Sequence, residues 1–118
     1  MAARPDAISF DLSLVRREDG DAIAEIADTG AGIFAGAVRT ILPSNTKDDP
    51  PAQTARNILR FWRALGMNPS QAAHQIVVTP ACGLAGASPT RAVEALAHSR
   101  EAARIVPELA EETTGDDE

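Results

Sequence analysis

Residues 76–89 read IVVTPACGLAGASP and contain the clearest strand, loop and helix start in the sequence. Ile76-Val-Val-Thr79 is a short run of β-branched residues, which is typical of a buried strand. A glycine-rich loop follows, and Ser88-Pro89 then supplies a helix N-cap with proline at the first helical position. This stretch therefore predicts a strand, a loop and a helix in succession.

The same order occurs twice upstream. Ala7-Ile-Ser-Phe-Asp11 predicts a strand that is followed by a helix over 22–27, and Gly32-Ile-Phe-Ala-Gly36 predicts a second strand that is followed by a helix ending at Leu65. Strands that alternate with helices indicate βαβ units and a parallel sheet. The strands are short apolar runs without strict alternation, so we expect both faces of the sheet to be covered.

The second and third of the expected helices each show an apolar face, as does the first through Ile23, Ile26 and Ala27. Between 55 and 65 the apolar residues recur at helical spacing, and basic residues occupy another side, which predicts a hydrated face there. The apolar set is Ala55, Ile58, Leu59, Trp62 and Leu65, and the basic set is Arg56, Arg60 and Arg63. Asn68-Pro69 is expected to close this helix. In the last helix the expected apolar stripe is Ala92, Leu96, Ser99, Ala103 and Val106, and Pro107 is expected to end it.

The formal charge of -6 belongs to the end of the sequence. Six of the 17 acids are Glu108, Glu111, Glu112, Asp116, Asp117 and Glu118, and the remaining 11 acids face 11 bases. We therefore expect one neutral folded unit over residues 1–107 and an acidic, disordered tail over residues 108–118. A neutral body with four aromatic residues and no tyrosine argues against a nucleic-acid partner, which needs a basic face or a stacking platform.

The cysteine content and the first residues indicate where in the cell the protein is expected. Cys82 is the single cysteine, so no internal disulfide can form. The start, Met1 to Pro5, lacks the apolar core of a signal peptide, and no apolar run approaches the ~20 residues that cross a bilayer. The expectation is a cytoplasmic protein without a membrane partner.

Two residues at the ends of expected strands are candidates for a site, because parallel α/β proteins hold ligands at the carboxyl ends of their strands. Cys82 lies in a glycine-rich turn before a helix, where a thiol tends to ionise and can bind metal or attack. The alternative is a small buried hydrophobic residue. Asp11 ends the first strand and can serve catalysis or a metal, or it can cap the following loop.

The glycine run at 30–36 and the two histidines do not indicate a functional site. Gly30-Ala-Gly32-Ile-Phe-Ala-Gly36 lies before and within a strand, whereas a dinucleotide fingerprint follows a strand, so close packing is expected there. His98 follows Glu94 by four residues and is expected to form a solvated pair with it. His74 precedes the third strand, at the end of the sheet opposite a site.

Val77-Val-Thr-Pro-Ala-Cys-Gly-Leu-Ala-Gly86, with Ser88-Pro89 and the helix after it, resembles the C-terminal end of cobalamin-independent methionine synthase. The short, single-barrel actinobacterial versions are the most similar. The resemblance extends back through the stretches at 6–11 and 32–36. It therefore covers about Pro5 to Pro107.

The resemblance implies a partial TIM barrel, in which this chain forms the last three βα units of a (β/α)8 fold. In that family a catalytic zinc ion is held by a His-x-Cys pair, a Glu and a final Cys. Cys82 matches the final Cys, and Asp11 falls at the Glu position with a side chain one methylene shorter. The His-x-Cys pair has no counterpart in this sequence, and a family histidine expected near Ala37-Val38 is also absent.

The chemistry implied by the resemblance is methyl transfer from a methylated folate to a thiol such as homocysteine, because coordination to zinc keeps a thiol deprotonated. A complete barrel needs ~250 residues, so the chain alone is expected to be inactive. The alternative expectation is a non-catalytic remnant or interaction module, which pairs with itself or with a complementing chain through an exposed strand edge.

Overall fold

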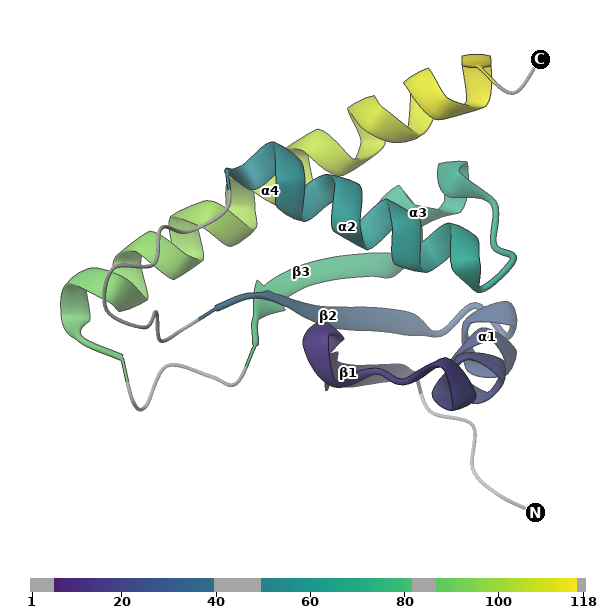
Figure 1. Cartoon of the computed structure of the whole chain (residues 1–118), viewed down its shortest axis with the longest axis horizontal. Helices are drawn as coiled ribbons and strands as arrows, with labels where there is room; N and C mark the ends of the chain where they lie inside the picture. Colours follow the sequence, from purple (N-terminus) through teal and green to yellow (C-terminus); the bar gives the residue numbers. More distant parts are fainter. Residues whose placement is uncertain (1–5, 40–49, 82–86, 117–118) are drawn as a thin grey trace.

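The computed structural model describes residues 6–39, 50–81 and 87–116, with side chains through residue 111 (Figure 1). Three strands form one parallel sheet in the order β1-β2-β3. Their bounds are Ala7–Asp11 for β1, Gly32–Val38 for β2 and Ile76–Pro80 for β3. The prediction of an α/β fold with parallel strands is confirmed, and the first strand has the expected bounds.

Four α-helices and two short 3-10 turns lie in the described residues. The helices are α1 (Gly20–Asp28), α2 (Pro51–Ala64), α3 (Pro69–Gln75) and α4 (Pro89–Asp116), and the turns are η1 (Leu12–Leu14) and η2 (Arg17–Asp19). Ser88 caps α4 as expected, because its Oγ accepts a hydrogen bond from the Arg91 amide at 3.1 Å. None of these helices has both the length and the apolar character needed to traverse a bilayer.

Helix α3 was not expected, because Asn68-Pro69 was interpreted only as the end of the preceding helix. The same two residues also begin a helix. Asn68 Oδ1 accepts from the Ser70 amide at 3.0 Å, and Pro69 occupies the first helical position. Asparagine as N-cap and proline after it are the usual start of a helix. The same dipeptide is therefore compatible with the end of one helix and with the start of the next.

The sheet is covered on one face. Helices α2, α3 and α4 lie on the same side of the strands (Figure 1). Ile33, Ala35 and Val78 point toward these helices and are buried, whereas Phe34 and Val77 are 41% and 47% exposed. The expectation that both faces are covered is therefore wrong. The helix between β1 and β2 is only nine residues long and lies at the end of the sheet where β2 begins.

The core lies between the covered face and helix α2. Trp62, Ile58 and Leu59 of α2 are almost completely buried, and the expected apolar stripe is confirmed for the residues within the helix. Leu65, which directly follows the end of α2, is partly buried against the core. The Trp62 indole Nε1 donates to the Asn68 carbonyl at 2.9 Å, which satisfies its polar atom inside the core. The rings of Phe10 and Phe61 lie with centroids 5.7 Å apart, so α2 also contacts the edge strand β1.

Helix α4 presents small side chains to the core. Ala95, Ala102 and Ala110 are buried together with Ser99 and Val106, whereas Leu96 of the expected stripe is 50% exposed. Ala103 of that stripe is also exposed. The expected face is therefore partly wrong. An alanine-rich helix has apolar residues on more than one side, and close packing against α2 and α3 favours the side with the smallest residues.

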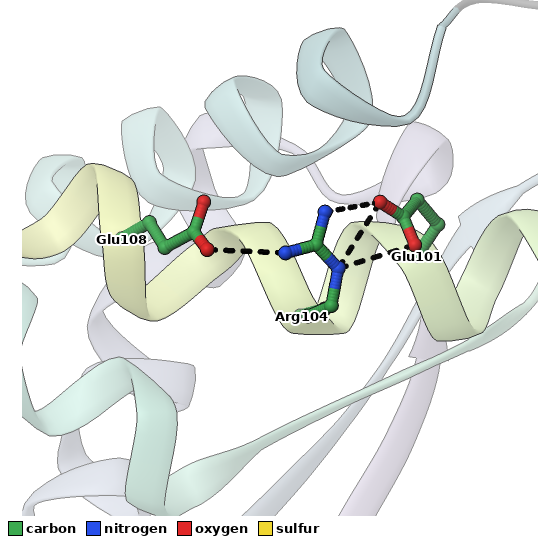
Figure 2. A network of polar contacts seen from close by, with 3 residues as sticks. All are labelled: Glu101, Arg104 and Glu108. Carbon is green, nitrogen blue, oxygen red and sulfur yellow. Dashed lines mark hydrogen bonds and ion pairs between the residues drawn. The ribbon is translucent and has the colours of Figure 1, made fainter.

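Pro107 lies inside α4 and does not end it, contrary to expectation. Proline removes one backbone hydrogen bond and usually kinks or breaks a helix. Charged side chains link the turns on either side of it. The Arg104 guanidinium donates to Glu101, and its Nη1 donates to Glu108 at 3.1 Å (Figure 2). The hydrogen bond from Arg104 lowers the pKa of Glu101, as expected for a carboxylate beside a cation.

At Gly36, β2 passes close to the backbone of its neighbours. A Cβ atom at this position would meet the Ala81 Cα and the Phe10 carbonyl oxygen at 2.9 Å, which is closer than such atoms come. The neighbours are backbone atoms, so they cannot turn aside as a flexible side chain can. The expected close packing of this glycine run against the sheet is confirmed at Gly36.

We predict that Gly36→Ala lowers the free energy of unfolding by about 1–3 kcal/mol, because the added methyl group forces backbone to move. Gly20→Ala is the matched control. At Gly20 the nearest atom to an added Cβ is Leu65 Cδ2 at 3.8 Å, and alanine suits a helix. Urea unfolding of both variants tests the prediction, and it is contradicted if Gly36→Ala is no less stable than Gly20→Ala.

Candidate functional site

The carboxyl ends of the strands converge around Gly36. Asp11 pairs with Gly36 in the register of β1 and β2, and Gly36 pairs with Thr79 in that of β2 and β3. The Ala81 amide donates to the Val38 carbonyl at 2.8 Å, which holds the residue after β3 against the end of β2. Asp11 and Ala81 therefore border one cleft at this edge of the sheet.

Asp11 caps the turn that follows it. Its Oδ1 accepts hydrogen bonds from the Ser13 amide at 2.9 Å and from Ser13 Oγ at 2.6 Å. This contact starts the 3-10 turn η1 at the end of β1. The capping alternative is thus confirmed for Asp11, and its role as a metal ligand stays a prediction.

Zinc needs several nitrogen, sulfur or carboxylate ligands at one point. Among residues 6–39, 50–81 and 87–111, no three His, Cys, Asp or Glu side chains come together in a way that could hold a metal ion. Cys82, the second predicted ligand, lies outside the described residues. The described side chains at this edge offer one carboxylate, already bonded to Ser13, and do not by themselves form a zinc site.

His98 is buried between two helices, and the expected solvated pair with Glu94 is wrong. The imidazole is 8% exposed, and its Nε2 lies 2.7 Å from Oγ1 of Thr54, which is also buried. Glu94 instead pairs with Arg91 at 3.5 Å on the surface of α4. The hydrogen bond of His98 joins α4 to α2 and satisfies polar atoms in the helix interface.

His74 and the arginines of α2 are where the sequence predicts them. His74 is exposed on α3, two residues before the start of β3, at the end of the sheet opposite Asp11. Arg56, Arg60 and Arg63 are all exposed, so their prediction as a hydrated helix face is confirmed. Arg60 has a second property that sequence reasoning missed, because it also lines the cleft at the carboxyl edge.

That cleft has a volume of about 500 Å³ and lies between η1, the end of β2 and helix α2. Asn57, Arg60, Phe61 and Ala64 of α2 line it, at the spacing of one helix face. This spacing is visible in the sequence. It does not by itself predict a cleft, because Arg60 also belongs to the exposed basic side of the same helix.

No protein-family model, no curated protein and no solved structure matches this chain. The candidate site therefore has to be argued from its own residues.

We predict that Thr54→Val lowers the free energy of unfolding by about 1–3 kcal/mol, because the variant keeps the shape of the side chain and removes the hydroxyl that bonds His98. Thr90→Val, at an exposed position in the first turn of α4, is the control and is expected to leave stability nearly unchanged. Denaturant unfolding measures both. Equal stability of the two variants would show that the buried hydrogen bond is not stabilising.

Proposed function

We propose that this chain supplies the last three βα units of a (β/α)8 barrel and thereby contributes to a zinc-dependent thiol methyltransferase of the methionine-synthase type. One observation carries the barrel part of the proposal. The strands follow one another in sequence order, and helices α2, α3 and α4 lie on one face only. A (β/α)8 barrel has this arrangement, whereas a doubly wound sheet reverses its strand order and carries helices on both faces.

The position of Asp11, one of the two predicted ligands, supports the same proposal. Barrel enzymes place their active sites at the carboxyl ends of the strands. Asp11 ends β1, and Ala81, which precedes Cys82 in the chain, lies against the end of β2. The thiol acceptor, such as homocysteine, and the methylated folate donor rest on the sequence resemblance alone.

The open face of the sheet is the part that the rest of a barrel would bury. Ser9, Phe34 and Val77 form one row across the three strands on that face. Barrel interiors are filled by side chains of this kind in layers. In the proposal, the remaining strands and the His-x-Cys pair, which is the other half of the metal site, come from residues other than these 118.

We predict that the purified chain retains no zinc after dialysis against a chelator and transfers no methyl group. Combined with the first five βα units of a methionine synthase of this type, it is expected to retain zinc stoichiometrically. Elemental analysis measures the metal, and an assay for the methylated thiol measures the activity. Stoichiometric zinc in the chain alone, or none in the combination, contradicts the proposal.

Asp11→Asn sharpens this experiment. Asparagine keeps the Oδ1 that accepts from Ser13, so the turn is preserved while the anionic ligand is lost. The variant is expected to weaken zinc retention in the combined protein by more than about 10-fold. Asp28→Asn, at the exposed end of α1, is the control and should retain zinc fully.

A second candidate function is that of a non-catalytic interaction module, and the open face favours it. Phe34 and Val77 are neighbours in the register of β2 and β3, and both are large, apolar and exposed. Adjacent exposed apolar side chains on a sheet favour association with another chain. A second copy of this chain is the simplest such partner.

We predict for this candidate that the chain self-associates and that Phe34→Thr shifts it toward the monomer, because the variant removes the largest apolar side chain on the open face. Val93→Thr is the control, since Val93 is 68% exposed but lies on α4. Sedimentation over a range of concentrations measures the association. A chain that stays monomeric throughout, or that responds equally to both variants, contradicts this candidate.

A further inference from the structure

The cleft at the carboxyl edge of β1 has a mixed lining. Leu12 and Phe61 form part of its apolar wall, and Arg39, Asn57 and Arg60 bring polar groups to it. Its volume of about 500 Å³ lies in the range of cavities that hold small molecules, which are mostly apolar with a few polar groups that orient the ligand. The cleft lies on the side of α2, so it is distinct from the open face of the sheet.

Arg39 and Arg60 carry exposed guanidinium groups without a carboxylate partner among the described residues. Other arginines of the chain are engaged: Arg91 pairs with Glu94, and Arg104 pairs with Glu101 and Glu108. The backbone of Arg39 is held against α4, because its carbonyl accepts from Arg91 Nη2. Two cations thus line the cleft, against the single carboxylate of Asp11.

Asn57 is oriented so that it donates. The Arg56 Nη2 group donates to Gln53 Oε1 at 3.0 Å, and Gln53 Nε2 donates to Asn57 Oδ1 at 2.9 Å. This contact sets the Asn57 amide with its oxygen toward Gln53, so its NH₂ group is a donor at the cleft that Arg60 also lines. Two guanidinium groups and an amide NH₂ at one cleft form a set of donors that suits an anion.

We propose that this cleft binds a small organic acid, with the carboxylate of the ligand at Arg39, Asn57 and Arg60 and its apolar body against Leu12 and Phe61. Arginine recognises a carboxylate through parallel N–H···O bonds, and the apolar wall favours a ligand with a hydrocarbon or aromatic portion over a bare ion. The proposal does not depend on the methyl-transfer function or on a complete barrel, since the described part of this one chain forms the cleft.

The test is titration of the isotope-labelled full chain with phenylpropionate, followed by the backbone amide signals of Arg39, Asn57 and Phe61. The neutral phenylpropanamide tests the need for the charge, and inorganic phosphate tests the need for the apolar body. Saturable shifts at these amides with phenylpropionate, and weaker binding of both other probes, are expected. Equal binding of the amide or of phosphate overturns the proposal, as does the absence of shifts at the cleft.

Variants assign the binding to the named side chains. Arg60→Gln is expected to raise the dissociation constant for phenylpropionate about tenfold, the loss of one charge-assisted contact, and Asn57→Asp to abolish binding by turning a donor into an anion. Arg63→Gln is the matched control, because Arg63 is exposed on the same helix and does not line the cleft. Unchanged affinity in Arg60→Gln, or an equal loss in Arg63→Gln, overturns the assignment.

Discussion

The close approach of backbone at Gly36 is the constraint on which the arrangement of the sheet edge depends. The Phe10 carbonyl and the Ala81 backbone both occupy the space that a side chain would need. Phe10 is the residue before the end of β1, and Ala81 directly follows β3. The C-terminal ends of both outer strands therefore lie against Gly36 of the central strand. Asp11 and Ala81 lie at one cleft for this reason.

The largest side chain of the central strand lies on the open face of the sheet. Ala35 points to the helices and Phe34 to the open side, so the central strand has its largest side chain outside the core. On the covered side, alanines of α4 let the helices lie close to the strands, and Trp62 and Ile58 of α2 fill the remaining volume. Within the part of the chain that the structure describes, close packing is therefore found on one face of the sheet, and Phe34 and Val77 on the other face stay exposed.

Sequence reasoning predicted the parallel strands and the core face of α2, because these depend on local patterns of apolar residues. Its predictions were wrong where one sequence pattern is compatible with two different structures. Asn68-Pro69 both ends α2 and begins α3, and the alanine-rich helix α4 has two candidate faces. His98 illustrates a third limit, since its partner Thr54 is 44 residues away and no local spacing reveals the contact. The cleft likewise needs η1 and α2 to meet.

The burial of Trp62 has a practical consequence. The chain contains one tryptophan and no tyrosine, and the indole has no exposed surface. Its ultraviolet fluorescence therefore comes from one ring at the centre of the packed side of the protein, with no second emitter of comparable strength. Native emission should occur at the short wavelengths of an apolar environment, and its red shift on unfolding reports solvent entry into the core and nothing else in the chain.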